Sequence, residues 1–487
     1  MWKRALPILI LLIVVVAAPL VLRRDSEVAE AGQGDDRLVI ITPHNDSIRA
    51  EFGEAFAEHW MEKTGRSIHV DWRAPGGGGE IRKLVNGAFE AAEDLGKQGT
   101  EFDVFFGGGT KDFIGQAKLG HLAELTVFED EPQWFRDDCV PASFSGETYY
   151  DPDHHWVGVC VSQFGIVYNK DAVEWIDVAS PQRWEDLGDP AYFGRLALAD
   201  PTKSSSVTQA FEMLIQEQMQ LVLAEEGDSP EARAKGWKQG LNLLQRLGAN
   251  ARYFTDSASK IPHDVALGDA AAGTCIDFYG RSFEDSVRSH DGESRLKWIS
   301  PIGGTSVSVD SIAVFRGAPQ REIAQEFVRF CLTERGQLLW NLKPGVEGGP
   351  KSRSLRRLPV RRALYTPDRL AQFTDPDALP FERAGSFVYQ PELTGAAFDA
   401  LRVIFRAMCM DPHDELKDAW EAAAIEGRGS LERLFDVEVV SYERVMNELL
   451  PVLDGEDRLE SARAMTEISK HFRKQYQQVA KGEGGKP

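Results

Sequence analysis

The sequence predicts an α/β fold in which a mainly parallel sheet carries helices on both faces. From Arg37 onward, apolar runs and amphipathic helical patterns alternate as strand, helix, strand, helix, strand, the order in which crossover helices join parallel strands. The third strand, residues 102–106, runs directly into Gly107-Gly108-Gly109-Thr110 ahead of another helical pattern. Glycines let backbone amides approach a bound group, and a helix N-terminus adds partial positive charge, so this turn is a candidate ligand site.

Length and charge narrow the classes of protein to which the chain can belong. With 487 residues it is too long for one compact core and is expected to form two or three domains. A formal net charge of −21 leaves no surplus of lysine and arginine for neutralising phosphates. This balance excludes a nucleic-acid-binding protein.

The N-terminus predicts export. Residues 1–24 are expected to form a signal anchor or transmembrane helix, because Lys3 and Arg4 precede the uncharged run 5–22, which is long enough to cross a bilayer core. An Ala-x-Ala site at 29–31 lies too far beyond the apolar run for a typical cleaved signal peptide. We therefore expect a protein of the periplasm or cell surface, attached to the cytoplasmic membrane through this helix, with residues 25–36 as a linker.

The cysteines suit an exported protein. The chain has five cysteines. Because this number is odd, at least one cysteine is unpaired in an oxidising compartment if the chain is a monomer. We expect a monomer. The short intervening loop favours a bridge between Cys139 and Cys160, and the absence of a C-x-x-C pattern gives no support for a structural zinc site. The five are Cys139, Cys160, Cys275, Cys331 and Cys409.

The first α/β region begins with an apolar strand at residues 38–42. Ser47 can cap the following helix, which Gly65 ends, and the residues spaced for its buried face are Ile48, Phe52, Phe56 and Trp60. A second strand at 68–72 leads through the loop 75–79 to a helix that is expected to bury Ile81, Leu84 and Val85. The exits of the first three strands, at 42–46, 75–79 and 107–110, should therefore open on the same edge of the sheet.

A second α/β region follows residue 136. Strands are predicted within 157–169 and at 195–199, 273–277 and 306–315, the last returning to the first region, and helices follow Ser204-Ser205-Ser206 and occupy 257–267 and 322–332. The three serines offer hydroxyls and amides at the start of a long helix. The segment 350–365 is rich in basic residues: Lys351, Arg353, Arg356, Arg357, Arg361 and Arg362. A solvated loop that balances local acidic charge is expected, and the alternatives are that the segment lines the cleft mouth or docks on anionic partners.

In this order the features resemble the extracellular solute-binding proteins of ABC importers, especially the ferric-iron-binding branch of the type 2 periplasmic binding proteins. The resemblance rests on residues 42–45, 102–109, 165–169, 181–187, 194–206, 265–273, 309–313 and 324–332. It implies two α/β lobes joined by crossing strands, a ligand held in the cleft between them, and closure that presents the complex to a membrane permease. Lobe 1 is expected at 37–135 and 305–345 and lobe 2 at 136–304, with a mostly helical C-terminal extension, 346–487, packed on lobe 1.

The resemblance places the ligand site at the strand exits. The candidate contacts are His44, Asn45, Gly108, Gly109, Thr110, Ser204, Ser205, Ser206, Asp277, Tyr279, Arg281, Ser308 and Asp310. Iron-binding relatives use adjacent tyrosinates with a histidine and a carboxylate, whereas this chain has the pair Phe278-Tyr279. His44, Asp277 and Tyr279 form a tentative metal set, and Arg281 would equally suit a phosphonate, phosphate or carboxylate.

The predicted function is non-enzymatic capture of a small solute for an ABC permease, with ferric iron as the first expectation. Phosphonate, phosphate, thiamine and polyamine-like solutes are the alternatives, and no cofactor is expected beyond iron as the transported ligand. A hydrolase or transferase on the same scaffold would need Ser204–Ser206 and His44 as nucleophile and base, but the sequence lacks a G-x-S-x-G elbow. A membrane-anchored sensor of the same ligand is a third possibility.

Overall fold

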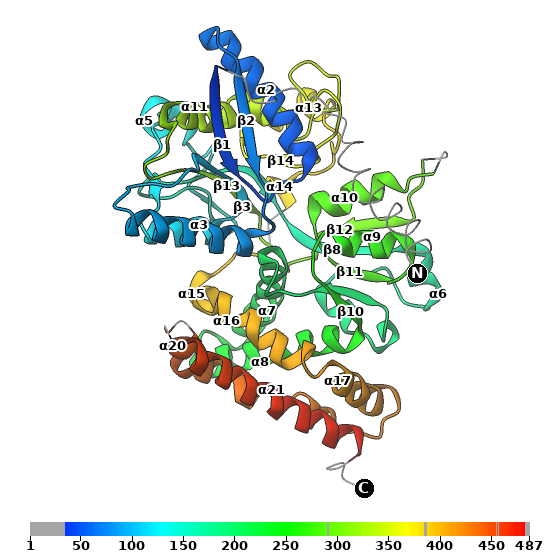
Figure 1. The fold of residues 1–487 in the computed structure, drawn as a ribbon. Helices are drawn as coiled ribbons and strands as arrows, with labels where there is room; N and C mark the ends of the chain where they lie inside the picture. Colours follow the sequence, from blue (N-terminus) through cyan, green and yellow to red (C-terminus); the bar gives the residue numbers. More distant parts are fainter. Residues whose placement is uncertain (1–34, 290–291, 384–386, 454, 456, 483–487) are drawn as a thin grey trace, which may run out of the picture.

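The computed structural model describes residues 35–289, 292–383, 387–453, 455 and 457–482. They form two α/β lobes and a C-terminal group of helices (Figure 1). The expected signal anchor, residues 1–24, and nearly all of the linker 25–36 lie outside the described residues. Within the described ranges, none of the helices combines the length and the apolar character that a bilayer crossing requires.

The sheet of lobe 1 contains the predicted strand, helix, strand, helix, strand unit. Its path is β14-β7-β13-β3-β1-β2, and β4 pairs with β13. As predicted, β1 lies parallel to β2 and β3, whereas β13 runs antiparallel to β3, β4 and β7. The strands are β1 (Asp36–Ile41), β2 (Ile68–Arg73), β3 (Val104–Gly109), β4 (Leu122–Ala123), β7 (Val157–Ser162), β13 (Ser308–Phe315) and β14 (Leu358–Pro359).

Helices cover both faces of this sheet: α2 (Asp46–Thr64), α3 (Gly78–Asp94), α4 (Thr110–Lys118), α5 (Val127–Asp130), α11 (Arg321–Leu332), α12 (Glu334–Leu338), α13 (Pro367–Leu370) and α14 (Pro380–Arg383). The cap of α2 is Asn45 rather than the predicted Ser47, because the Asn45 side chain accepts the Ile48 amide; Gly65 ends the helix in a left-handed conformation, as predicted. Leu84 is 42% exposed, so its predicted burial is wrong. The buried stripe of α3 instead advances from Ile81 to Val85.

Lobe 2 is built on a five-stranded sheet in the order β10-β9-β11-β8-β12. Its strands are β8 (Phe164–Asn169), β9 (Leu196–Ala199), β10 (Ala251–Thr255), β11 (Ala272–Ile276) and β12 (Leu296–Ile299), and its helices are α6 (Lys170–Trp175), α7 (Ser205–Glu226), α8 (Pro230–Asn250), α9 (Lys260–Leu267) and α10 (Asp277–Ser286). The chain enters lobe 2 where β7 passes into β8 at Gln163, and it returns between β12 and β13. The two crossing strands, β7 and β13, therefore belong to the sheet of lobe 1 and connect it to lobe 2.

The C-terminal helices pack on lobe 2, so the prediction that they pack on lobe 1 is wrong. They are α15 (Pro391–Thr394), α16 (Phe398–Phe405), α17 (His413–Trp420), α18 (Leu431–Leu434), α19 (Tyr442–Arg444), α20 (Leu450–Leu453) and α21 (Arg458–Ala480). Leu401, Trp420 and Phe472 share one apolar core with α7 and α8. Segment 338–373 instead belongs to lobe 1, because β14 joins its sheet and Leu358 enters its core. The extension therefore begins near Phe387.

The predicted Cys139–Cys160 bridge is wrong, because all five cysteines are buried and free. Cys160 lies within β7, where its side chain enters the apolar core of lobe 1. Cys139 belongs to the same core, but its sulfur accepts a hydrogen bond of 3.2 Å from Nε of Arg361. Burial raises the pKa of the Cys160 thiol well above its ordinary value, which makes a reactive thiolate unfavourable there.

Candidate functional site

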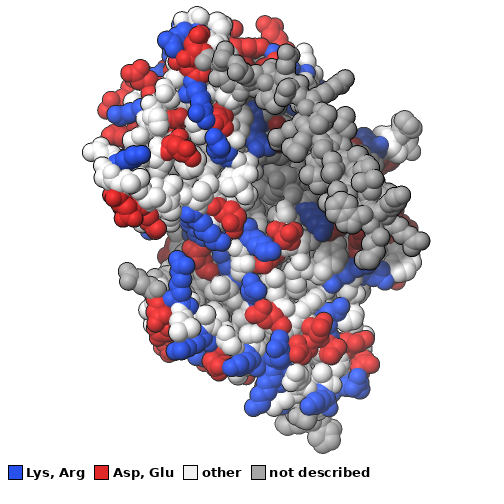
Figure 2. Space-filling view, viewed as in Figure 1, with Lys and Arg blue, Asp and Glu red and all other residues white. Residues whose placement is uncertain are grey.

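A cavity of about 390 Å³ lies between the two lobes. Lobe 1 lines it with the loops after β1, β2 and β3, so the three strand exits do open on one edge as predicted. Lobe 2 contributes the starts of α7, α9 and α10. On the face shown in Figure 2, acidic and basic side chains mix over the parts of both lobes that are in view.

The structure brings most of the predicted contacts together. Those that line the cavity are His44, Asn45, Gly108, Gly109, Thr110, Ser204, Ser205, Ser206, Tyr279, Ser308 and Asp310. Asp277 is fully buried and does not line it: one carboxylate oxygen accepts the Phe278 amide at 2.8 Å and the other accepts Nη2 of Arg281 at 2.7 Å. Since α10 begins at Asp277, residues 277 and 281 share one helical face, and Arg281 lines a second cavity while it is paired with the buried Asp277.

Helix N-termini converge on the cavity from both lobes. The N-cap residues Gly77 of α3, Gly109 of α4, Ser204 of α7 and Ser259 of α9 all line it. The first amides of a helix have no partner within the helix, and they carry the positive end of the helix dipole. This arrangement favours an anion in the cavity.

Gly107, the first of the three glycines that end β3, serves packing rather than a ligand. Gly107 has a φ of 91°, and a Cβ at this residue would lie 2.2 Å from Nε2 of His44. The His44 ring meets Phe106 edge-on at 4.7 Å, and its pKa is well below the ordinary value because it is buried and because Arg357 is near. His44 is therefore a neutral, tightly packed ring in the cavity wall.

Gly78 permits a close approach between the lobes at the other end of the cavity. A Cβ at this residue would lie 2.2 Å from Oδ2 of Asp112 and 3.3 Å from Oγ of Ser205, which begins α7 of lobe 2. A larger residue at position 78 would therefore clash with Asp112 of lobe 1 and would crowd Ser205 of lobe 2.

Arg357 lines the cavity although the predicted contacts do not include it, so for this residue the alternative that the basic segment 350–365 lines the cleft mouth holds. Instead of lying in a solvated loop it is only 4% exposed, with Nη1 placed 2.8 Å from Oδ2 of Asp310 and 2.7 Å from Oγ of Ser162. Its guanidinium lies over the Phe278 ring, 3.8 Å from the centroid. Within the described chain, its buried Nε has no hydrogen-bond partner. The apolar residues Leu355, Leu358 and Val360 within the basic run were the available sequence signal that this segment enters a core.

The backbone fixes Arg357 from both sides. Its amide donates to the carbonyl of Trp340 at 3.1 Å, and its carbonyl accepts Nδ2 of the buried Asn341 at 2.8 Å. The preceding residue, Arg356, has a φ of 54°, a left-handed conformation that costs about 1–2 kcal/mol for a residue with a Cβ. Burial opposes the charge of Arg357, but Asp310 keeps its pKa above the ordinary value. The site thus holds a rigid and permanently charged donor.

Burial raises the pKa of two carboxyl groups in the cavity wall. The pKa of Glu147 rises to about 7, and the Glu147 carboxyl accepts the Ser306 hydroxyl at 2.5 Å. Burial also raises the pKa of Asp112. A negative charge is therefore less favourable on either group than on an exposed carboxylate.

The tentative metal set is not assembled around the cavity. The Asp277 carboxylate already accepts hydrogen bonds from Arg281 and the Phe278 amide, and His44 is packed among aromatic rings. Tyr279 does line the cavity, but its pKa is raised, mainly by burial, which disfavours the tyrosinate that ferric ion prefers. Among the described residues, no group of three or more histidine, cysteine, aspartate or glutamate side chains is placed to hold a metal.

Comparison with known families matches residues 101–344 to the bacterial extracellular solute-binding proteins. The chain belongs to this family. Curated relatives include an uncharacterised protein of Haemophilus influenzae, 24% identical over 52% of this chain and 65% of the relative. The phosphoglycerate transport regulatory protein PgtC of Salmonella typhimurium is 24% identical over 37% of this chain and 39% of its own length. The iron uptake protein A1 of Synechocystis is 25% identical over 46% and 57%. The matches span less than two thirds of each relative.

Solved structures support the two-lobed fold of this solute-binding protein. Iron-bound HitA from Pseudomonas aeruginosa aligns with a TM-score of 0.52 at 19% identity, covering 76% of this chain and 99% of HitA. The spermidine/putrescine-binding protein PotD from Streptococcus pneumoniae aligns with a TM-score of 0.50 at 14% identity, covering 76% and 98%. The predicted type 2 periplasmic-binding-protein fold is confirmed, and family membership implies an extracellular or periplasmic location.

Proposed function

We propose that this solute-binding protein captures a small anionic solute that bears a phosphate, phosphonate or carboxylate group, and delivers it without catalysis to an ABC permease. The observation that carries the proposal is Arg357, which lies buried at the cavity with an unpartnered Nε. A planar guanidinium in a dry setting binds oxyanions through charge-assisted hydrogen bonds.

The surrounding groups suit the same ligand. An oxyanion beside Arg357 would meet the N-termini of α4 and α7 and the hydroxyls of Thr110 and Ser204–Ser206. Because α4 belongs to lobe 1 and α7 to lobe 2, one anion would join both lobes and favour closure. The cavity of about 390 Å³ falls in the range of roughly 300–1,000 Å³ that is typical of organic ligands.

Ferric ion is the second candidate, because HitA is described as iron-bound and another relative is named an iron uptake protein. The residues of this site support iron less than an anion. The tentative metal set offers a single phenol, that of Tyr279, and burial raises the pKa of this phenol, which disfavours the tyrosinate form. Binding of iron together with an anion would still require Tyr279 as a metal ligand.

A hydrolase or transferase would need a serine activated by a base. His44 is the histidine of the cavity wall, and its Nε2 has no hydrogen-bond partner in the described part of the chain. With the ring held against Gly107 and Phe106, His44 is not paired with any of Ser204–Ser206. Capture rather than catalysis is therefore the function that we propose, and the apolar N-terminal run 5–22 remains the proposed membrane anchor.

A thermal-shift series on the full chain in mild detergent tests this proposal. Phosphate, methylphosphonate, 3-phosphoglycerate, ferric citrate, thiamine and spermidine are compared, because a ligand that binds only the folded state stabilises it by about 2.7 kcal/mol at one hundred times its Kd. We expect a shift with a phosphate or phosphonate that is absent in Arg357→Met and present in Arg353→Met, an exposed arginine of the same segment. A shift with ferric citrate alone, together with a visible colour that Tyr279→Phe removes, would replace the anion by iron.

A further inference from the structure

The C-terminal extension reaches across the cleft to lobe 1. Its helices share the core of lobe 2, and Figure 1 shows α15 and α16 beside α7 and below α3 of lobe 1. Phe398 at the start of α16 lines the ligand cavity. The extension lies beyond residues 101–344, the part of the chain that matches the family.

Lys111 of lobe 1 is held by three residues of the extension. Its Nζ donates to the Tyr389 hydroxyl at 3.0 Å and to the carbonyl of Gly395 at 3.4 Å. The same ammonium group lies 5.5 Å from the centroid of the Tyr389 ring and 5.4 Å from that of Phe398. Lys111 also lines the cavity, in the first turn of α4. The extension thus fixes the position of a cation at the candidate anion site.

Tyr389 is itself fixed by lobe 2 and by the hairpin 143–148, which packs on the core of lobe 1. Its hydroxyl donates to Oε1 of Glu212 at 2.8 Å, and the Thr394 hydroxyl donates to the same oxygen at 2.7 Å. The Tyr389 amide donates to the carbonyl of Ser145 at 2.9 Å. A residue that is only 5% exposed and bonded at both ends provides a rigid partner for Lys111.

A second contact links α16 to both sides of the cleft. Nη2 of Arg402 lies 3.2 Å from Oγ of Ser205, and Nε of Arg402 lies 3.2 Å from Asp399. Asp399 in turn lies 3.5 Å from Arg82 of α3. The chain of contacts runs from lobe 1 through the extension to Ser205, which lines the cavity.

We propose that the segment 387–406 completes the ligand site: it positions Lys111 of lobe 1 at the closed cleft, with Tyr389 and Phe398 as the positioning residues. When the lobes separate, Lys111 leaves Phe398 and the Gly395 carbonyl, because α15 and α16 pack in the core of lobe 2. Tyr389, which is bonded to both lobes, then loses one of its two anchors. Closure and the placement of this cation are therefore coupled. That the ligand is an anion rests on the proposed function, whereas the contact between Lys111 and the extension does not depend on it.

Distances between spin labels on the full chain test the interlobe contact without any ligand. Labels at Glu90→Cys in α3 and Glu174→Cys in α6 report the separation of the lobes, and the native cysteines are buried. Lys111→Met and Tyr389→Phe should shift the distribution toward longer distances. Lys118→Met, which removes a lysine from the exposed end of the same helix, should leave it unchanged. Equal distributions in all four proteins would overturn the proposal.

Titration with inorganic phosphate tests the effect on binding. We expect Lys111→Met to weaken the affinity about tenfold and Tyr389→Phe about threefold to tenfold, the size of a lost charge-assisted hydrogen bond, and Lys111→Arg to retain most of it. An unchanged affinity in Tyr389→Phe beside a loss in Lys111→Met would make Lys111 a ligand contact that the extension does not position, which contradicts the proposal. If wild type binds no tested anion, the proposed function fails, and the label distances still decide the interlobe contact.

Discussion

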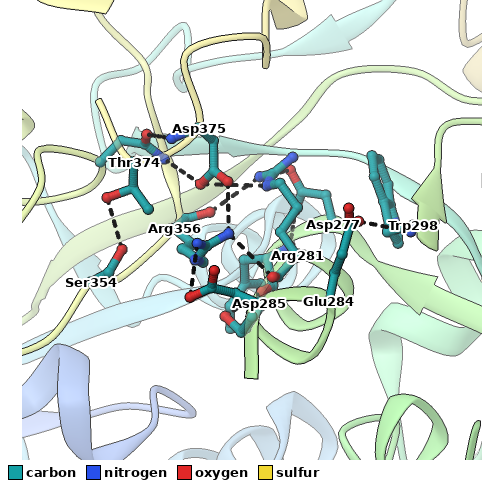
Figure 3. A network of polar contacts seen from close by, with 12 residues as sticks. Asp277, Arg281, Glu284, Asp285, Trp298, Ser354, Arg356, Thr374 and Asp375 are labelled. Atoms are coloured by element: carbon teal, nitrogen blue, oxygen red, sulfur yellow. Dashed lines mark hydrogen bonds and ion pairs between the residues drawn. The ribbon is translucent and has the colours of Figure 1, made fainter. Parts of the chain in front are cut away.

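Two cavities formed by described residues lie between the lobes and differ in character, and the smaller of these two has the features of a ligand site. The cleft measures about 390 Å³ and the second cavity about 670 Å³. In the second cavity, Arg281 lies 2.7 Å from Asp277, and Arg356 lies 2.9 Å from Asp375 and 3.2 Å from Asp285 (Figure 3). Its arginines are therefore ion-paired with carboxylates of the protein itself.

The cleft differs in how few carboxylates surround its arginine and in the helix N-termini around it. Arg357 has one carboxylate partner, Asp310, whereas Arg281 and Arg356 of the second cavity each have two. Among the described residues, a buried Nε without a hydrogen bond occurs in both Arg357 and Arg281, but helix N-termini from both lobes line the cleft. The local charge balance, rather than volume, distinguishes the candidate binding site from the structural contact. The second cavity instead joins the segment 354–375 to α10, since Arg281 and Arg356 also bond to each other's carbonyls at 3.1 and 3.2 Å.

Replacing Arg357 should have the largest effect. Arg357→Met is expected to weaken anion binding more than about one-hundredfold, and it leaves Asp310 buried without its partner, which costs about 3–5 kcal/mol of unfolding free energy. Calorimetric titration and urea unfolding measure the two effects separately. Arg357→Lys should recover charge but not the stacking on Phe278. Wild-type affinity in Arg357→Met would remove the cleft from consideration as the anion site.

Replacing Arg281 should break the second cavity and spare the cleft. Arg281→Met leaves the fully buried Asp277 without its ion pair, so we expect a loss of about 3–4 kcal/mol in urea unfolding. Anion affinity of the folded variant, measured well below its melting temperature, should change less than about threefold. A larger loss of affinity would show that the two cavities act together.

The pH dependence of stability should reveal the neutral carboxyl group of the cleft. Burial raises the pKa of Glu147 to about 7 from 4.5, so its contribution to stability is fully present below about pH 4.5 and is lost as the pH rises through about 7. The full effect is about 3 kcal/mol. Urea unfolding from pH 4.5 to 8 should show a steeper decline for wild type than for Glu147→Gln. Parallel curves would place the Glu147 titration outside this range.

The smallest effect is expected at Tyr279. If the ligand is an anion held by Arg357 and helix N-termini, Tyr279→Phe removes one peripheral hydroxyl and should weaken binding less than about threefold. Titration of both proteins with the same phosphate or phosphonate checks this. Abolished binding would instead support a metal held by the phenolate.

The sequence predicts the lobe 1 side of the cleft well, because three consecutive parallel strands place their exits on one edge. It also predicts the serines that begin α7, since hydroxyl residues before an amphipathic run mark a helix start. Arg357 is not predictable in this way: its place depends on pairing between β14 and β7, and its bond to Ser162 spans 195 residues of sequence. The prediction that Asp277 and Arg281 contact the ligand in the cleft is wrong, because α10 begins at Asp277 and both side chains lie on a face of this helix that does not line the cleft.

The left-handed backbone at Arg356 makes spacing matter more than composition in this segment. Arg356 lines the second cavity and Arg357 lines the cleft, so these adjacent residues have different roles although they belong to one basic run in the sequence. Inserting or deleting one residue between Leu355 and Leu358 would exchange their directions while leaving the number of charges nearly unchanged. Alignments of relatives should therefore compare register within this segment, because a homologue with the same arginines in another register would have lost its cleft cation.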